Sequence, residues 1–394
     1  MGLTIDRGMQ KKILLPYFLA GSGHLVSANA IAWYLGEKCP HWDLRFLEPA
    51  DEFDAKELDN TYRRFWHTLL KRPKLTAVGF WLSNVYLPNI TVGTCHRANE
   101  KYKGHVRDYL LDYRPDLVIT THWGCGLLFQ AARKDYNIDV PLYLVRNDLG
   151  GAFWPQDCGA DTTFVMSEEA RQAFINIGLL ESKVIRVNPL VRPEFINGET
   201  AIEKVKQKIG IEDRDFTVLM SAGGEGIGRI EATAKIILDV AKERGKEIKV
   251  VIITGRNQKL YHDLREEFDE ATVKVLGYRD DMHDLMVASD LVVGKCGANY
   301  TMETLMSRRP FLISQIGAPN EEYNKDFVVN HGYGWYASRP VELIEIFTKI
   351  FTDDGELEEK QRNLGSMPNK SGAEQIADYI IDAVQNPAAK VPSV

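Results

Sequence analysis

A histidine directly after a glycine-rich turn is the first residue in the sequence that could do acid–base chemistry. His24 follows Gly21, Ser22 and Gly23, and this turn joins a predicted strand to a predicted helix. Small residues let the backbone approach a ligand, and a helix N-terminus offers free N–H groups. A neutral imidazole there could take a proton from a hydroxyl nucleophile. The alternative is a tight turn whose histidine only caps the helix, and the spacing alone leaves both interpretations open.

A second turn, 222–228, has the composition of a phosphate-binding loop. It contains four glycines in six positions, between a predicted strand and a predicted helix. It lacks the GK[ST] ending of a Walker loop, and its spacing does not match the dinucleotide fingerprint. A loop that cradles phosphate in another kind of doubly wound domain is favoured over a simple packing turn.

A third segment, 294–303, repeats this arrangement after a predicted strand over 291–293. Glu303 is expected in the first turn of the following helix, where a carboxylate could accept both hydroxyls of a ribose. An acidic residue is also common at a helix N-terminus because the helix dipole favours it. From this segment alone, a purely structural role of Glu303 is preferred.

These turns require strands and helices that alternate along the chain. Strands are expected at 12–18, 44–47, 117–121, 142–145, 163–165, 183–187, 216–220, 249–254, 273–276, 291–293 and 310–314. Helices are expected at 25–37, 227–244, 282–288 and 371–384. Short apolar strands that alternate with helices predict parallel sheets covered on both faces. The sequence therefore predicts an α/β protein of two Rossmann-like, doubly wound domains.

The prolines and glycine between 189 and 200 suggest the domain boundary. We expect an N-terminal domain over 1–197, which the C-terminal segment 371–394 rejoins, and a C-terminal domain over 198–370. The length of 394 residues agrees with two domains.

Composition restricts the classes of partner. The net charge of −7 argues against nucleic acid as the main partner. The five cysteines are scattered without a CxxC pair, which predicts reduced thiols rather than disulfides or a zinc site. No apolar run approaches the roughly 20 residues that span a bilayer, and 1–12 lacks the apolar core of a signal peptide. We expect a cytoplasmic protein.

Taken together, these segments resemble the monogalactosyldiacylglycerol synthase and diacylglycerol glucosyltransferase family. That family belongs to the GT-B group, which includes the peptidoglycan enzyme that adds N-acetylglucosamine to lipid I. Residues 223–234, GGEGIGRIEATA, nearly reproduce the family's GGGEGMGPIEATA, and 255–260 is similar to its GRN-K-L element. Shorter matches occur at 21–24, 121–122, 147–149, 167–169 and 192–193, and at Lys295, Gly297, Glu303, Glu321 and Asn324.

The resemblance implies a GT-B fold with a cleft between its domains, a UDP-hexose donor in the C-terminal domain and a lipid acceptor in the N-terminal one. The catalytic residues would be His24, as the acceptor-side base or as an acceptor ligand, and Asp148, as the partner of His24 or as an alternative base. The donor ligands would be Gly223, Gly224, Glu225, Gly226, Arg256, Asn257, Lys295, Gly297, Asn299, Thr301, Glu303, Glu321 and Asn324. Among these, Glu303 would contact the ribose, and Glu321 and Asn324 the sugar. Gly21, Ser22, Gly23 and His122 would lie on the acceptor side. Transfer would invert the anomeric centre, and neither a metal nor another cofactor would be required.

The sequence departs from the family at one phosphate contact. The family's Gly-Pro-Gly-Thr is here 297–300, Gly-Ala-Asn-Tyr, which places Tyr300 where a phosphate-binding threonine is usual. Asn299 or Thr301 could replace that contact.

A segment over 62–87 combines aromatic and basic side chains without an acidic one. Phe65, Trp66, Phe80 and Trp81 accompany Arg63, Arg64, Lys71, Arg72 and Lys74. Such a composition is typical of segments at an anionic membrane surface, although a helix pair with an aromatic core and a solvated basic face has it too. With the family context we favour peripheral membrane binding.

The sequence thus predicts an inverting transferase that moves galactose or glucose from UDP-hexose to the hydroxyl of diacylglycerol. The alternatives are another amphiphilic or polyprenyl-linked acceptor, a UDP-sugar 2-epimerase of the same fold, or a sugar-nucleotide-binding protein with a decayed site.

Overall fold

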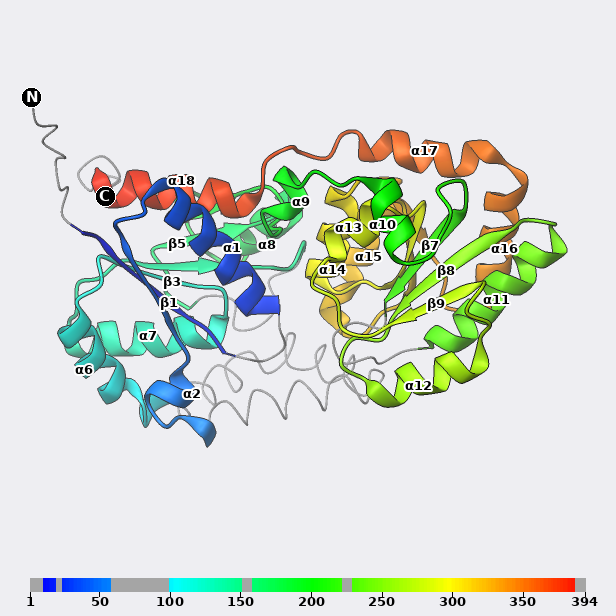
Figure 1. Ribbon diagram of the computed structural model, residues 1–394. Helices are drawn as coiled ribbons and strands as arrows, with labels where there is room; N and C mark the ends of the chain where they lie inside the picture. Colours follow the sequence, from blue (N-terminus) through cyan, green and yellow to red (C-terminus); the bar gives the residue numbers. More distant parts are fainter. Residues whose placement is uncertain (1–9, 19–22, 58–98, 151–157, 222–228, 387–394) are drawn as a thin grey trace, which may run out of the picture. The chain divides into compact units, whose positions relative to one another are not determined.

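The chain divides into two compact units, 1–192 with 370–394, and 193–369. The computed structural model describes residues 10–18, 23–57, 99–150, 158–221 and 229–386, which Figure 1 draws in colour.

The first unit is built on a sheet of six parallel strands in the order β2-β1-β3-β4-β5-β6. The strands are β1 (Lys12–Pro16), β2 (Asp43–Leu47), β3 (Leu117–Thr120), β4 (Leu142–Val145), β5 (Thr162–Val165) and β6 (Val184–Arg186). The helices are α1 (Gly23–Lys38), α2 (Pro49–Glu52), α6 (Lys103–Tyr113), α7 (Trp123–Tyr136), α8 (Glu168–Asn176) and α18 (Gly372–Gln385), with a 3₁₀ turn at Glu181–Lys183.

Helices cover both faces of this sheet (Figure 1). Leu142 and Leu144 of β4 belong to the same core as Val106 and Leu110 of α6. Tyr143, which points to the opposite face of the strand, contacts the ring of Tyr379 on α18 with a centroid distance of 5.8 Å. Because every residue of β3 and β4 is buried, these strands consist of continuous apolar runs rather than an alternating pattern.

The second unit has a sheet of six parallel strands in the order β12-β11-β10-β7-β8-β9. The strands are β7 (Phe216–Ser221), β8 (Ile248–Ile253), β9 (Val273–Leu276), β10 (Leu291–Lys295), β11 (Phe311–Gln315) and β12 (Gly334–Tyr336). The helices are α9 (Glu194–Asn197), α10 (Ile202–Lys208), α11 (Ile230–Glu243), α12 (Gln258–Glu267), α13 (Met282–Val287), α14 (Ala298–Met306), α15 (Glu322–Asn330), α16 (Pro340–Thr352) and α17 (Asp354–Leu364), with a 3₁₀ turn at Pro319–Glu321.

The prediction of two Rossmann-like domains is confirmed, and one strand was missed. Strand β12 has only three residues, and it begins with Gly334. A Cβ at Gly334 would lie 1.9 Å from the carbonyl oxygen of Phe311, so this close strand pairing requires glycine. A short run of Gly-Trp-Tyr carries too little pattern to predict a strand.

The C-terminal helix packs on the first unit. The Ser371 hydroxyl accepts from the Val191 N–H and donates to the Val191 carbonyl. Lys38 of α1 pairs with Glu374 and Asp378 of α18 at 2.9 and 2.6 Å. Figure 1 shows α18 and α1 side by side. The chain therefore returns to the N-terminal sheet after it has completed the second unit.

Candidate functional site

The chain fixes His24 through two contacts with the turn that follows β3. The Nδ1 atom of His24 lies 2.6 Å from the carbonyl oxygen of Thr121, and the Thr121 hydroxyl donates to the His24 carbonyl at 2.8 Å. A carbonyl oxygen only accepts hydrogen bonds, so Nδ1 must carry the proton. In the neutral imidazole the lone pair then lies on Nε2, and this nitrogen is the one that can accept a proton.

The surroundings of His24 also keep it neutral. Burial lowers its pKa below the ordinary value of 6.5, and the Arg146 guanidinium lowers it further. The Thr121 carbonyl and the Asp148 carboxylate act in the opposite direction, but they do not cancel the effect of burial. At neutral pH His24 is therefore in the form that a general base requires.

His122 packs against His24 and is neutral as well. The two rings are 4.6 Å apart with an interplanar angle of 67°. His122 caps the N-terminus of α7, where its Nδ1 accepts from the Gly124 N–H at 3.0 Å, and it is only 3% exposed. Burial, His24 and Arg146 hold the pKa of His122 well below its ordinary value. The structure thus brings His24, His122 and Asp148 together, while an acceptor-side role of His122 stays a prediction.

Arg146 belongs to this cluster and was missed in the sequence. It follows the last residue of β4 and is 7% exposed, and burial lowers its pKa while Asp148 raises it. A charged pair, Arg146 and Asp148, directly beyond the carboxyl end of a buried strand was the available signal, because ligand sites in parallel sheets lie at such ends. Gly23 is the first residue of α1, and Gly21 and Ser22 lie outside the described residues.

In the second unit, Glu321 links the last residue of β10 to the turn that follows β11. Its Oε1 lies 3.0 Å from Lys295 Nζ, and its Oε2 accepts from the Gly317 N–H at 2.6 Å. A Cβ at Gly317 would lie 2.6 Å from Lys295 Cδ, so only glycine leaves room for the lysine. Asn324 reinforces the arrangement by donating to the Cys296 carbonyl at 2.9 Å. Lys295, Gly297, Glu321 and Asn324 therefore form one cluster, and their contacts with a sugar nucleotide stay predictions.

Helix α14 begins at Ala298 after Gly297 as N-cap, which corrects the predicted place of Glu303. Its first turn contains no acidic residue, so Glu303 lies in the second turn, where it is 8% exposed. Thr301 has no exposed surface, whereas Asn299 is half-buried. Of the two residues proposed to replace the family's phosphate contact, Asn299 is the more accessible.

Tyr300 packs in the structure rather than standing free at the turn. Its ring contacts Phe311 edge-on with a centroid distance of 5.7 Å. A Cβ at Gly294 would lie 2.9 Å from Tyr300 Cε1, so that glycine lets the ring lie on the strand. Burial raises the pKa of the tyrosine hydroxyl. The departure from the family pattern is thus accommodated by packing.

The remaining predicted donor residues lie after β8 or outside the described residues. The Asn257 side chain caps α12 by accepting from the Leu260 N–H at 3.0 Å. The Arg256 guanidinium lies 4.9 Å from the centre of the Tyr278 ring. The loop that contains Gly223, Gly224, Glu225 and Gly226 is not described, and neither is the segment that contains Arg63, Arg64, Phe65, Trp66, Lys71, Arg72, Lys74, Phe80 and Trp81.

The described residues contain neither a metal-binding cluster nor a membrane-spanning helix. No group of three or more His, Cys, Asp or Glu side chains there could hold a metal ion, and the absence of a metal requirement stays a prediction. Within the same residues, no helix is both long and apolar enough to cross a bilayer. Four cysteines there, at 39, 125, 158 and 296, are buried free thiols, as predicted.

Comparison with known proteins agrees with the resemblance. Residues 217–377 match the glycosyltransferase family 28 C-terminal domain. The chain is 26% identical to monogalactosyldiacylglycerol synthase 2, chloroplastic, of Arabidopsis thaliana, over 92% of this chain and 78% of the relative. It is also 26% identical to the processive diacylglycerol beta-glucosyltransferase of Staphylococcus carnosus, over 88% of this chain and 86% of the relative.

Solved structures agree on the fold. The structure of Acinetobacter baumannii MurG aligns with 95% of this chain and 100% of the MurG chain, with a TM-score of 0.61 at 13% identity. Staphylococcus aureus MnaA, solved with UDP, covers 98% with a TM-score of 0.63 at 14% identity, and 99% of it is covered in turn. The predicted resemblance and the GT-B type of fold are confirmed, while the cleft between the domains stays a prediction.

Proposed function

We propose that the chain, a sugar-transferring enzyme, moves a hexose from UDP-hexose to diacylglycerol. Residues 217–377 match the glycosyltransferase family 28 C-terminal domain, which supports the proposal. The observation that carries the proposal is the state of His24, which is neutral and has its Nε2 lone pair fixed by the Thr121 carbonyl. Both curated relatives named above are described as acting in diacylglycerol glycosylation, which supports the acceptor. The hexose is galactose or glucose.

In the proposed reaction, Nε2 of His24 takes the proton of the acceptor hydroxyl while its oxygen forms a bond to the anomeric carbon. The bond from that carbon to the diphosphate oxygen breaks, and UDP leaves with its electron pair. A single displacement of this kind inverts the anomeric centre and gives a β-glycoside. The Asp148 carboxylate favours the imidazolium that forms, since it raises the pKa of His24.

The donor would be held by the cluster after β10 and β11 together with the 222–228 loop. Lys295 supplies a cation for the diphosphate, and Glu303 would accept from the ribose hydroxyls. No metal or other cofactor takes part in this proposal. We also propose that the protein binds peripherally to the cytoplasmic face of an anionic membrane through the 62–87 segment.

The test is transfer from UDP-galactose or UDP-glucose to diacylglycerol in mixed micelles. His24→Ala should lower kcat by about 10²–10⁴-fold and leave UDP affinity unchanged, because general base catalysis contributes that much. Glu303→Ala should weaken UDP binding first. His41→Ala, at an exposed histidine of the same unit, is the matched control. Loss of UDP affinity in His24→Ala with unchanged turnover would refute the assignment of the base.

The same assay separates the alternatives. If glycolipid forms only from a polyprenyl-linked or other amphiphilic alcohol, the proposed acceptor is wrong but the proposed mechanism still holds. Isomerised UDP-sugar without any acceptor would instead support a 2-epimerase, and tight UDP binding without turnover would support a binding protein.

A further inference from the structure

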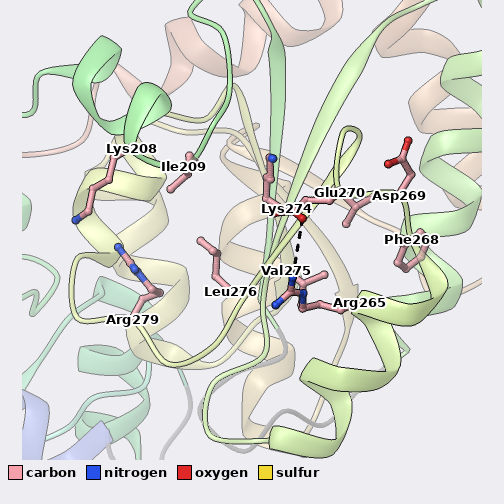
Figure 2. Close-up of a pocket in the computed structure, with 11 residues that line it drawn as sticks. Lys208, Ile209, Arg265, Phe268, Asp269, Glu270, Lys274, Val275, Leu276 and Arg279 are labelled. Atoms are coloured by element: carbon pink, nitrogen blue, oxygen red, sulfur yellow. Dashed lines mark ion pairs between the residues drawn. The ribbon is translucent and has the colours of Figure 1, made fainter.

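A cavity of about 500 Å³ lies beside β9, the edge strand of the second sheet (Figure 2). Its walls come from three places in the chain: the end of α10 with Ile209, the end of α12 with the following turn 268–270, and β9 with Arg279. None of the predicted donor residues that the structure describes lines it. The volume falls within the range of about 300–1,000 Å³ that is typical of small-molecule sites.

Basic side chains predominate around this cavity. Lys208, Arg265, Lys274 and Arg279 line it, against two acidic residues, Asp269 and Glu270. Figure 2 shows Glu270 paired with Arg265, at 3.9 Å, while Lys208 and Arg279 lie at the other end. These last two share the carboxylate of the neighbouring Asp281. Asp280 also acts on Arg279, so Lys208 and Arg279 are matched by two acidic residues.

Lys274 is the basic residue whose charge is left without a partner. It is half-buried and has no hydrogen bond or ion pair with any residue that the structure describes. Its ammonium lies beside the turn after α10, where a Cβ at Gly210 would lie 3.3 Å from Lys274 Nζ. Gly210 has a φ of +71°, which favours glycine there for a second reason. A half-buried ammonium without a counter-ion is stabilised when an anion joins it.

Apart from these charged residues, the cavity is lined by apolar side chains. Ile209, Phe268, Val275 and Leu276 line it beside the basic residues, and all four are partly exposed. Lys274 and Leu276 lie two residues apart on β9 and point to the face of the strand where Ile209 lies. Val275 points to the opposite face, where Phe268 packs. Inorganic phosphate would use only Lys274. We propose that the cavity binds a phosphate ester that carries a small apolar group, with the phosphate at Lys274 and the apolar group on Ile209 and Leu276. This site is independent of the proposed sugar transfer.

The test is binding of phenyl phosphate to the full chain, measured by calorimetry in the presence of saturating UDP. UDP occupies the donor site, so phosphate binding there is suppressed. Lys274→Met should weaken phenyl phosphate binding at least tenfold, equivalent to about 1.4 kcal/mol. Lys274→Arg should restore it, and Lys242→Met, at an exposed lysine of α11, should leave it unchanged. Equal thermal midpoints of these variants will show that the fold is intact.

Loss of phenyl phosphate binding when UDP is added would overturn the proposal, as would equal affinities of Lys274→Met and Lys242→Met. If phenyl phosphate and inorganic phosphate bind with equal affinity, the proposal that the ligand carries an apolar group is overturned. Vesicles of phosphatidylcholine with added phosphatidylglycerol identify the source of the ester. Lys274-dependent vesicle binding supports a lipid headgroup, and Lys274-dependent binding of phenyl phosphate alone supports a soluble ester.

Discussion

Gly317→Ala is the substitution whose effect the structure defines most closely. The new Cβ would lie 2.6 Å from Lys295 Cδ and 3.0 Å from both Lys295 Nζ and Glu321 Oε2. Carbon atoms in contact lie about 3.5–4.0 Å apart, so the lysine side chain must move away. Its ion pair with Glu321, at 3.0 Å, is then lost.

The expected cost is about 2 kcal/mol in the free energy of unfolding of the second unit. Overpacking costs about 1–3 kcal/mol, and a buried polar group that loses a partner costs about 1–3 kcal/mol. These costs do not add here, because movement of the flexible lysine relieves the overpacking while it breaks the pair. Glu321 is 4% exposed and keeps its bond from the Gly317 N–H, which limits the loss.

Urea unfolding of the full chain measures this cost. Gly277→Ala is the control in the same unit, since its Cβ would meet only the Gly255 carbonyl at 4.0 Å. The same substitution can be made in a Lys295→Ala background, where the Cδ atom of residue 295 is absent. There the cost of Gly317→Ala should fall below about 1 kcal/mol, because substitutions at residues in contact do not act independently. The reasoning is refuted if the cost is the same in both backgrounds or equals that of Gly277→Ala.

Three further predictions concern other parts of the chain. Asp148→Asn should move the acid limb of the kcat/KM profile to lower pH, because the carboxylate raises the pKa of His24; an unchanged limb contradicts this. Ser371→Ala should lower the free energy of unfolding of the first unit by about 1–3 kcal/mol, because it removes the hydroxyl that bonds Val191; urea unfolding measures it, and no loss excludes this role. Binding of the protein to anionic vesicles, measured by flotation, should weaken as salt is added but should not vanish. Replacement of both Trp66 and Trp81 by Ala should remove the salt-resistant part of the binding. A double variant that binds vesicles like the parent protein would show that the docking site lies elsewhere.

The sheets could be predicted from the sequence because their strands are buried on both faces. Strand β3 consists of Leu-Val-Ile-Thr between polar residues, and in a chain where such short runs alternate with helices this pattern indicates a buried parallel strand. The boundaries of α14 were harder, since Gly297 can serve either as a turn residue or as an N-cap. Its extended conformation makes it the N-cap, and this moves Glu303 out of the first turn.

Individual residues of the candidate site could be predicted from the sequence, but the contacts between them could not. His24 was identifiable from its turn, whereas its partner is a backbone carbonyl 97 residues away. A main-chain oxygen has no residue type, so composition and spacing carry no sign of it. The cavity beside β9 was missed for a related reason, because its lining comes from three segments that are brought together only by the fold.

The cluster around His24 and the cluster around Lys295 are built in the same way, and this suggests how substitutions around them will act. In each, a side chain near the carboxyl end of a strand is held by a group from the turn after the neighbouring strand. His24 meets the carbonyl of Thr121, and Lys295 meets the carboxylate of Glu321. Parallel strands place these ends together, so the fold itself supplies the supporting contacts. Substitutions in the supporting turns should therefore change the position and the basicity of the His24 imidazole or the Lys295 ammonium, even where they leave the fold intact.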